Sequence, residues 1–391
     1  MKALMLCEFY GEGLEYKENL FAKYCVKHGY EITVITSTTS DVFDYISEKH
    51  NKRLGRAEFY DSGVKIIRLP FKYNILNKLK KFISIYDDLV NEKPDIICMH
   101  DIMLNISEAV KYLKKYPRSK MVLSYHADYS NSGKNWLSLK ILHGVIRKRY
   151  LDRAINYIEK IFPVVPASFV FLNEVYKIPL SKMELVPLGA DSDLCDSVKN
   201  NFSLTDGLKK KYNITSDNIV LVTGGKFTPI KRTELLIEAA NKLRNKKIIL
   251  LIIGRASEND KSYYEMLRNM AASSSNIYFC GWQSTEGVYA HYHIADIAVF
   301  PASQSALWQQ AIASGLPLIV GDIGHNSIAY LNKYNNLIQI EKNNINSECI
   351  AKNIKRLIDD KSLLKSMKLG AQKVSMECLD WNILIKKSLL I

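Results

Sequence analysis

The stretch LVTGGKFTPIKR, residues 221 to 232, runs from apolar and β-branched residues into two glycines and then places Lys226, Lys231 and Arg232 within seven positions. Glycines at the end of a strand leave the backbone bare, and a helix that follows offers N–H groups and a partial positive charge. Lysine suits phosphate as a point charge with three donors. The stretch therefore predicts an anion site at the end of a buried strand, and a surface turn with solvated lysines is the alternative.

A second segment, DIAVFPASQSALWQQAIASGLPLIVGD at 296–322, repeats this pattern of a strand followed by a helix start. Ser303 and Ser305 are natural N-cap residues for that helix. In a parallel sheet, the N–H groups beside them would face the same carboxyl edge as Lys226. Two anion-receptive helix starts on one edge fit a diphosphate better than a monophosphate.

Thirteen apolar runs of strand length alternate with segments of helical period along most of the chain. The first seven lie at 2–7, 31–36, 65–69, 95–99, 121–125, 161–165 and 184–188. The other six lie at 218–223, 248–253, 277–282, 296–300, 316–320 and 336–340. Continuous Val, Ile and Leu runs separated by helices are what a parallel sheet covered on both faces requires. The pattern predicts an α/β protein with two Rossmann-like, doubly wound parallel-sheet domains.

The length of 391 residues, 47% of them hydrophobic, provides enough apolar surface for two cores. We predict an N-terminal domain over 1–191 and a C-terminal domain over 218–375. Residues 192–217 are polar and poor in strand formers, which favours an interdomain connection there. The helical tail, 376–391, is expected to return to the N-terminal domain, with Trp381 as its anchor.

Motifs for cofactors and metals are incomplete. The first turn, CEFYGEGLEY, begins like a dinucleotide fingerprint but has Tyr16 where the third glycine belongs, and Val220 stands where a Walker loop has its first glycine. The Asp-Ser-Asp string at 191–193 lies in the predicted hinge, which favours a structural role. Seven scattered cysteines without a Cys-x-x-Cys pair indicate core residues in a reducing cytosol. We therefore expect no cofactor and no metal.

Export and membrane-spanning signals are not apparent either. Only five uncharged residues separate Lys2 from Glu8, too few for the apolar core of a secretory signal. The strongly apolar run at 248–254 is far shorter than the ~20 residues of a membrane-spanning helix. We therefore expect a soluble protein or one that rests on a surface.

The positive charge is concentrated in one region. The chain carries a formal net charge of +14, and residues 111–153 hold 11 basic and 2 acidic side chains. Segments 71–83 and 135–155 mix Lys and Arg with Trp, Leu, Ile and Phe, as helices lying on an anionic membrane do. A solvated face on helices packed inward is the alternative. Nucleic acid is a less attractive partner, because no recognised DNA or RNA module is found.

Several of these segments resemble the retaining glycosyltransferases of family 4, which have the GT-B fold, and the resemblance covers nearly the whole chain. Its strongest parts are TGGKFTPIKRTELLIEAANKL, LLIIGRA, YAHYHIADIAVFPAS and QAIASGLPLIVGD. GEGLEYKENLFAKYCVKHGYEITVITS is similar to the family's glycine loop, first helix and second strand, and VPLGADSD to its hinge. The resemblance implies two domains facing a cleft and transfer of a sugar from a nucleotide diphosphate to a hydroxyl group, with retention at the anomeric carbon and without a protein nucleophile.

The resemblance also implies roles for single residues. Lys226 and Lys231 would grip the donor diphosphate and stabilise charge developing on it, with Lys226 in place of a more usual arginine. His126, which ends MVLSYH, would hydrogen-bond the donor sugar. Asp128 is expected to orient His126 or to meet the acceptor, and His100 is a further acceptor-side candidate. The remaining donor-binding candidates are Gly13, Gly225, Gly254, Ser303, Gln304, Ser305 and Gln310.

The chain departs from the family at two glutamates that usually have seven residues between them. The second position is Gln310, and the first, eight residues earlier, is Ala302. An amide still hydrogen-bonds a ribose, and the string SQSALWQQ is similar to one in a subset of the family, which favours a shifted loop over an inactive site. Two other hypotheses stay open: a homologue that binds nucleotide sugars without transfer, and a sugar-nucleotide epimerase with the same architecture.

The expected donor, acceptor and cellular location follow from the resemblance and the basic segments. The expected donor is a nucleotide-diphosphate sugar, with a UDP-sugar favoured, and the expected acceptor is a lipid-linked glycan in bacterial surface polysaccharide synthesis. We expect a cytoplasmic protein held peripherally at the inner face of the cytoplasmic membrane through residues 71–83 and 135–155.

Overall fold

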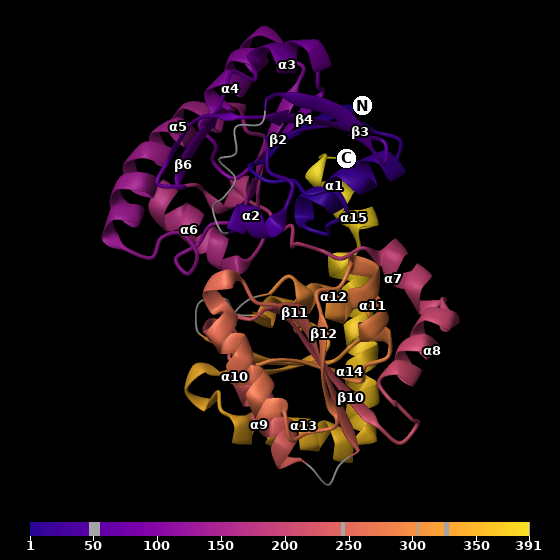
Figure 1. Cartoon of the computed structure of the whole chain (residues 1–391). Helices are drawn as coiled ribbons and strands as arrows, with labels where there is room; N and C mark the ends of the chain where they lie inside the picture. Colours follow the sequence, from indigo (N-terminus) through magenta and orange to yellow (C-terminus); the bar gives the residue numbers. More distant parts are fainter. Residues whose placement is uncertain (47–54, 244–246, 303–304, 324–327, 391) are drawn as a thin grey trace. The chain divides into compact units, whose positions relative to one another are not determined.

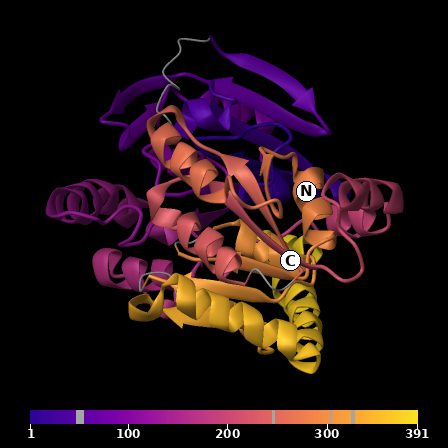
Figure 2. The same cartoon turned by 60° about the horizontal axis from the view of Figure 1, so that its bottom comes forward.

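The structure, a computed structural model, describes residues 1–46, 55–243, 247–302, 305–323 and 328–390. The chain divides into two compact units. The first unit comprises Met1–Pro187 and Trp381–Ile391, and the second comprises Leu188–Asp380. Each unit is built around its own sheet with helices packed against it (Figure 1, Figure 2).

The first unit contains a seven-stranded sheet with the order β3-β4-β2-β1-β7-β8-β9. Only the β3–β4 pair in this sheet is antiparallel among the described strands. The strands are β1 (Lys2–Leu6), β2 (Glu31–Ser37), β3 (Ala57–Asp61), β4 (Val64–Leu69), β7 (Ile96–His100), β8 (Lys120–Tyr125) and β9 (Lys160–Pro163). A separate antiparallel hairpin consists of β5 (Phe71–Ile75) and β6 (Leu79–Phe82).

Helices of the first unit fall into two groups along the chain. Before β8 they are α1 (Lys17–Lys27), α2 (Val42–Ile46), α3 (Tyr86–Glu92) and α4 (Ile106–Lys115). After β8 they are the π-helix η1 (Leu137–Arg147), α5 (Lys148–Ala154), η2 (Ile155–Tyr157), α6 (Pro166–Tyr176), η3 (Leu180–Lys182) and α15 (Trp381–Ser388). None of the helices that the structure describes, in either unit, is long and apolar enough to cross a membrane.

Both faces of this sheet are buried, which explains the continuous apolar runs of its strands. In β1, Leu4 and Leu6 belong to a cluster with α4 and α6, whereas Ala3 and Met5 belong to a cluster with α1 and α15. Because neighbouring side chains of a strand point to opposite faces, a strand covered on both sides needs an apolar residue at every position. The prediction of a parallel sheet from these runs is confirmed.

The second unit contains a six-stranded, wholly parallel sheet with the order β12-β11-β10-β13-β14-β15. The strands are β10 (Ile219–Lys226), β11 (Ile248–Arg255), β12 (Ile277–Gly281), β13 (Ile297–Phe300), β14 (Leu318–Asp322) and β15 (Leu337–Glu341). The chain order reverses between β10 and β13, and a crevice at such a switch point is where doubly wound sheets bind ligands.

Helices cover both faces of the second sheet, and α13 packs beside α9 (Figure 1). The α-helices are α7 (Ser192–Lys199), α8 (Phe202–Lys211), α9 (Thr233–Lys242), α10 (Lys261–Ala271), α11 (Thr285–His293), α12 (Leu307–Ala313), α13 (Ser347–Asp359) and α14 (Lys361–Val374). Shorter helical turns are η4 (Pro229–Lys231), η5 (Glu258–Asp260), η6 (Ile328–Leu331), η7 (Lys342–Asn344) and η8 (Ser375–Leu379).

The division of the chain needs correction at three points. The first unit ends at Pro187 instead of residue 191, and the returning segment begins at Trp381 instead of 376. Residues 192–217, expected as an interdomain connection, form α7 and α8 within the second unit. The segment looked like a linker because its polar residues outnumber the few, including Cys195 and Val198, that anchor α7 in the core.

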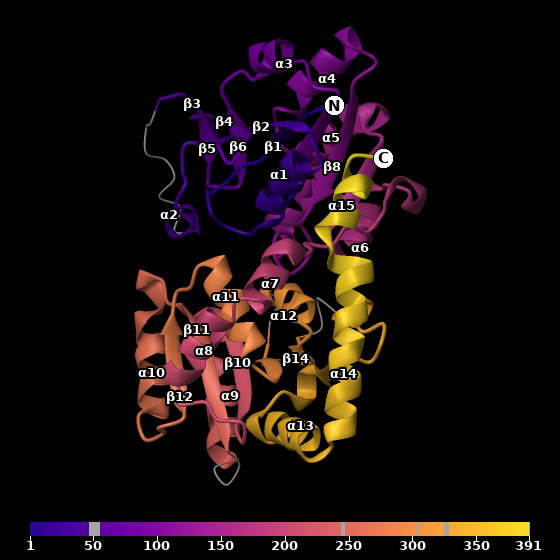
Figure 3. The same ribbon diagram turned by 90° about the vertical axis from the view of Figure 1, so that its right-hand side faces the viewer.

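Trp381 anchors the C-terminal segment to the first unit, as the sequence predicted. Its side chain is fully buried and lies 6.5 Å from the ring of Phe21 and 6.4 Å from that of Tyr24, measured between ring centroids. Both partners lie on α1, and Figure 3 shows α15 beside this helix.

Two expected elements in the first half were wrong. Residues 184–188 form no strand, although Met183 makes a single bridge to Ile161. Residues 71–83, read as a surface helix, form the β5–β6 hairpin. Helical structure over 135–155 is confirmed by η1 and α5.

Candidate functional site

The carboxyl ends of β10 and β11 approach each other more closely than any side chain permits. Gly225 pairs with Gly254 in the ladder, and a Cβ added at Gly254 would lie 1.9 Å from the carbonyl oxygen of Gly225. Both glycines have positive φ, 133° and 142°. The two strand ends thus form a bare-backbone surface that depends on glycine at both positions.

Lys226 and Lys231 lie beside this surface. Cε of Lys231 lies 3.9 Å from the place that a Cβ added at Gly225 would occupy. Burial lowers the pKa of Lys226, and burial together with the nearby Lys226 lowers the pKa of Lys231 to about 8. Two ammonium groups that are partly desolvated and close to each other are stabilised by an anion. The structure therefore brings both predicted lysines to the same strand end.

The start of α9 contributes less than the sequence suggested. The turn η4 separates it from β10, and Arg232 enters the helix with a φ of 51°. Main-chain N–H groups of Lys231 and Arg232 donate to the carbonyls of Thr228 and Pro229, and that of Thr233 donates to the hydroxyl of Tyr263. These N–H groups are occupied within the protein, so the lysine side chains remain the chief candidates for contact with an anion.

The second predicted helix start is only partly described. Ser303 and Gln304 lie outside the described residues, whereas Ser305 accepts a hydrogen bond at Oγ from the N–H of Leu307. Gln310 and Ala302, the positions of the family's two glutamates, are both buried.

Gln309, which the sequence did not single out, is also buried and ties three segments together. Its Oε1 accepts from the N–H of Gly189, and its Nε2 donates to the hydroxyl of Tyr330. The pair of glutamines in WQQ indicated that one of them could have a special role. The sequence alone could not show which one, because this depends on how α12 is oriented against its neighbours.

Arg255 and Trp282 form another feature that the sequence did not reveal. The Arg255 guanidinium carbon lies 5.9 Å from the centre of the Trp282 ring. Arg255 ends β11, and Trp282 directly follows β12. A partly exposed aromatic ring with a cation over it therefore stands two strands from β10 at the same sheet edge.

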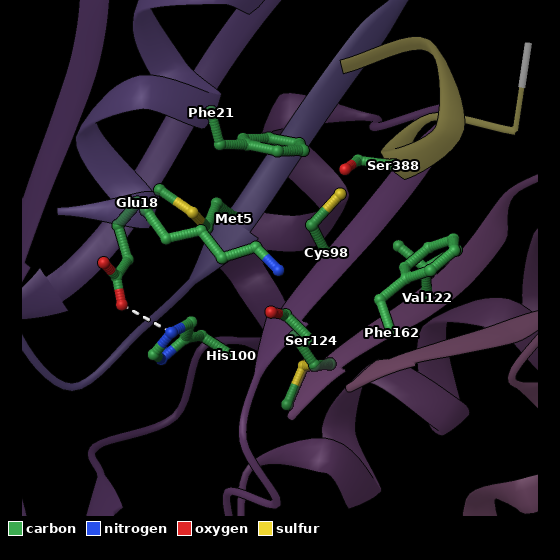
Figure 4. Close-up of a pocket in the computed structure, with 11 residues that line it drawn as sticks. Met5, Glu18, Phe21, Cys98, His100, Val122, Ser124, Phe162 and Ser388 are labelled. Atoms are coloured by element: carbon green, nitrogen blue, oxygen red, sulfur yellow. Dashed lines mark ion pairs between the residues drawn. The ribbon is translucent and has the colours of Figure 1, made fainter. Parts of the chain in front are cut away.

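Within the first unit, the carboxyl ends of β7 and β8 face the first turn of α1. His100 ends β7, His126 follows β8, and Glu18 is the second residue of α1. The Glu18 carboxylate forms an ion pair with Nε2 of His100, and the two histidine rings lie 4.1 Å apart between centroids (Figure 4 shows the Glu18–His100 pair). His100 and His126 were both predicted as site residues, and the structure brings them together. Glu18 was missed.

The charges around this cluster act in opposite directions on the two histidines. Burial would lower the pKa of His100, but the Glu18 carboxylate outweighs it and raises that pKa. Burial, assisted by the nearby His100 and Lys17, lowers the pKa of His126 well below its ordinary value. At neutral pH the cluster therefore holds an uncharged His126 beside an ion-paired His100.

Asp101, not Asp128, holds the main chain of His126 in place. Asp101 Oδ1 accepts from the N–H of His126 at 2.8 Å. Asp128 Oδ1 instead accepts from the N–H groups of Ser130 and Asn131, which closes a turn. The expectation that Asp128 orients His126 is thus corrected, because this carboxylate, three residues after the end of β8, bonds its own loop.

Gly13 lies exposed in the loop between β1 and α1, with a φ of 72°, and no atom of the described residues lies within 4 Å of an added Cβ. A glycine is favoured at this position because of the positive φ, and not because a larger side chain would clash with a neighbour. Close packing in this loop occurs at Gly11, where an added Cβ would lie 2.7 Å from the carbonyl oxygen of Ser40.

Two family models match the chain, one on each half. The model described as "Glycosyltransferase Family 4" matches residues 20–194, and that described as "Glycosyl transferases group 1" matches residues 205–374. Among curated proteins, the chain is 22% identical over 313 residues to the lipopolysaccharide 1,2-N-acetylglucosaminetransferase of Salmonella typhimurium, covering 77% of this chain and 72% of the relative.

Solved structures that share the fold over nearly the whole chain include a glycosyltransferase and a protein that binds UDP and glucose. A glycosyltransferase from Rickettsia africae has a TM-score of 0.72 at 17% identity, covering 100% of this chain and 97% of its own. The Anabaena HepE protein, in complex with UDP and glucose, has a TM-score of 0.69 at 14% identity, covering 99% and 98%. The predicted two-domain architecture is confirmed by these likenesses.

Proposed function

Because the chain belongs to the glycosyltransferases of family 4 with the GT-B fold, we propose that it moves a sugar from a nucleotide-diphosphate donor to a hydroxyl of a lipid-linked glycan in bacterial surface polysaccharide synthesis. Lys226 and Lys231 bind the diphosphate, and His126 donates a hydrogen bond to the donor sugar. The transfer retains the anomeric configuration and needs no metal. The name of the Salmonella relative supports the pathway, and the UDP and glucose bound to HepE support a UDP-sugar donor.

One observation carries the proposal: two partly desolvated lysines stand over a bare-backbone strand end at the carboxyl edge of a doubly wound sheet. Such an edge concentrates positive charge where a diphosphate leaving group becomes more negative. Charge stabilisation there lowers the barrier to breaking the bond between the anomeric carbon and the diphosphate oxygen without a protein nucleophile. Gly13, Gly225, Gly254, Ser303, Gln304, Ser305 and Gln310 complete the proposed donor-binding set, and His100 and Asp128 stay as acceptor-side candidates.

The reaction itself is tested with purified protein, a panel of nucleotide sugars, and lipid-linked glycan acceptors from surface polysaccharide synthesis. We expect release of nucleoside diphosphate that requires both a donor and an acceptor, and that persists in EDTA. Donor conversion without acceptor would indicate an epimerase instead. Nucleotide binding without any release of diphosphate across the panel would indicate a binding-only homologue.

A membrane-facing surface is supported by one face of η1. Trp136, Leu137, Ile141 and Val145 expose 67%, 61%, 39% and 56% of their surface. The last three recur every four residues, so they lie along one face of the helix. A helix that is merely solvated would present polar residues there.

The β5–β6 hairpin extends this surface. Ile75 and Leu76 are exposed at its turn, and Arg147 of η1 donates from Nη2 to the carbonyl of Lys78 at 3.1 Å. Exposed cations around these apolar residues are Lys72, Lys78, Lys134, Lys140 and Arg149. We call these residues, with Trp136 and the three exposed apolar residues of η1, the apolar-basic surface, and we propose that it binds the anionic inner face of the cytoplasmic membrane, which would place the acceptor lipid within reach.

The apolar-basic surface is tested by flotation with vesicles containing anionic lipid. Leu137→Ala combined with Ile141→Ala should weaken binding by about 10- to 100-fold, because each side chain loses roughly 1 kcal/mol of apolar burial. Binding of the unaltered protein should also fall with added salt. The control is Phe202→Ala, which removes an exposed aromatic ring from the second unit. Equal flotation of the double variant and the control would contradict the proposal.

A further inference from the structure

The cluster of Glu18, His100 and His126 has the composition of a transition-metal site. Each residue offers one ligand atom, and these atoms lie within 4.8 Å of one another. Two imidazoles and one carboxylate are a recurring donor set for Zn²⁺, with a further position left for water. We propose that this cluster binds one Zn²⁺ ion, with Glu18, His100 and His126 as its protein ligands.

The three ligands are held by separate rigid elements. His100 is the last residue of β7, His126 follows β8, which pairs with β7, and Glu18 lies in the first turn of α1. Because β7 also pairs with β1, which leads into α1, these elements belong to one packed unit. A site built on strand ends and a helix needs little rearrangement to close around an ion.

Ser124 and Asp101 hold His126 in position for an ion. Ser124 Oγ lies 3.2 Å from Nε2 of His126, which leaves Nδ1 of that ring for the metal, and Asp101 fixes the main chain of His126. Hydrogen bonds to the second nitrogen of a ligating histidine orient its ring. Zn²⁺ would take the place of the proton that His100 holds against Glu18, since imidazole binds metal in its neutral form.

One neighbour opposes a cation. Lys17 lines the same pocket as Glu18, His100 and Ser124, and its Nζ donates to the carbonyl of Val186 at 2.8 Å. Its positive charge lowers the affinity of the cluster for Zn²⁺. This site is therefore expected to bind metal reversibly, and replacing Lys17 by Met should tighten binding several-fold.

Occupancy has a consequence that rests on the proposed function. An ion bound to His126 withdraws this side chain from the donor sugar, so Zn²⁺ would inhibit a transfer that itself needs no metal. The cluster would then make the enzyme sensitive to free Zn²⁺. Binding and inhibition are measured separately, so loss of the transferase hypothesis leaves the metal site testable.

The experiment is equilibrium dialysis of the full chain against Zn²⁺, followed by metal analysis. The unaltered protein should retain one equivalent more than Glu18→Gln, His100→Gln and His126→Gln, each checked for folding by circular dichroism. The control, His28→Gln, removes a histidine that contacts Asn382 elsewhere in the unit and should retain the metal. Equal retention by the unaltered protein and the three folded variants would overturn the site.

A second readout covers variants that fail to fold. Co²⁺ bound to the unaltered protein should show the visible bands of a low-coordinate ion without a thiolate charge-transfer band. Cys98 lines the same pocket as Glu18 and His100, so a thiolate band would mean a different ligand set and would contradict the proposal (Figure 4). Ser124→Ala should weaken Zn²⁺ binding by about tenfold, because the hydrogen bond between Ser124 Oγ and the His126 ring is lost.

Discussion

Replacing Lys231 by alanine is expected to weaken binding of UDP by about 5- to 150-fold, and Lys226→Ala should have an effect of similar size. The range corresponds to about 1–3 kcal/mol for each charged contact with a phosphate oxygen. The two losses should be less than additive, because removing one lysine relieves its repulsion of the other. Isothermal titration calorimetry of the full chain measures both.

The matched control for these variants is Lys247→Ala. Lys247 lies just before β11, at the amino end of the same sheet, and pairs with Asp217 at 2.6 Å. Its removal changes the net charge of the protein equally but leaves the predicted site intact. Equal losses in Lys247→Ala and Lys231→Ala would show that the effect is a general one of charge, and unchanged affinity in Lys231→Ala would remove this residue from the site.

The affinity should also depend on pH in a way that identifies Lys231. Its pKa is lowered to about 8 in the free protein, and a bound anion, by stabilising the ammonium form, raises that pKa. Binding is therefore at full strength below about pH 8 and weakens as the pH rises through this value. The ligand loses its last phosphate proton near pH 6, outside this window. Lys231→Ala should abolish most of the slope.

Much of the fold could be predicted because the sheets are parallel and covered on both faces. The β11 run IILLII is apolar at every position because each face of the sheet has its own apolar core. Leu250 and Ile252 pack into the core on one face, and Ile249, Leu251 and Ile253 pack into the core on the other. The edge strand β3 has no such signal, because most of its residues are exposed or half-buried. A strand that is buried on both faces can be recognised from its continuous apolar run. An exposed edge strand has no comparable sequence pattern.

The β5–β6 hairpin was hidden for a different reason. Its turn places Leu76 and Asn77 at φ of 50° and 53°, a conformation that glycine commonly supplies. Without a glycine to mark the turn, the mixture of Leu, Ile, Phe and Lys resembled an amphipathic helix. The tertiary contact from Arg147 to this turn lies outside what a local pattern can reveal.

The candidate site was predictable where strand ends define it. His100 ends β7, His126 directly follows the neighbouring β8, and Lys226 ends β10, so the rule that ligands bind at carboxyl ends of strands was sufficient to select them as candidates. Glu18 was not predictable in this way, because its contact with His100 depends on how α1 packs across the sheet. The same holds for Arg255 and Trp282, which meet only because β11 and β12 are adjacent.

Replacing Gly254 by alanine should be the most damaging single-methyl change in the second unit's site. A Cβ 1.9 Å from the carbonyl oxygen of Gly225, and 3.0 Å from its carbonyl carbon, forces the ends of β10 and β11 apart. The φ of 142° adds strain for any L side chain. Together these costs are about 2–4 kcal/mol, which lowers the Tm by roughly 4–16 °C in a unit of this size.

The effect of Gly254→Ala should reach the donor site as well as stability. Displacement of Gly225 moves Lys226, its neighbour in the chain, away from the bare-backbone surface, so UDP binding should weaken even at temperatures where the variant is folded. Gly281→Ala separates the two causes, because Gly281 ends β12 with a φ of 73° but, in the part of the chain that the structure describes, no atom lies within 4 Å of an added Cβ. That variant bears the backbone strain alone, roughly 1 kcal/mol. If both variants lost the same stability and both bound UDP normally, the close approach of β10 and β11 would not be what shapes the site.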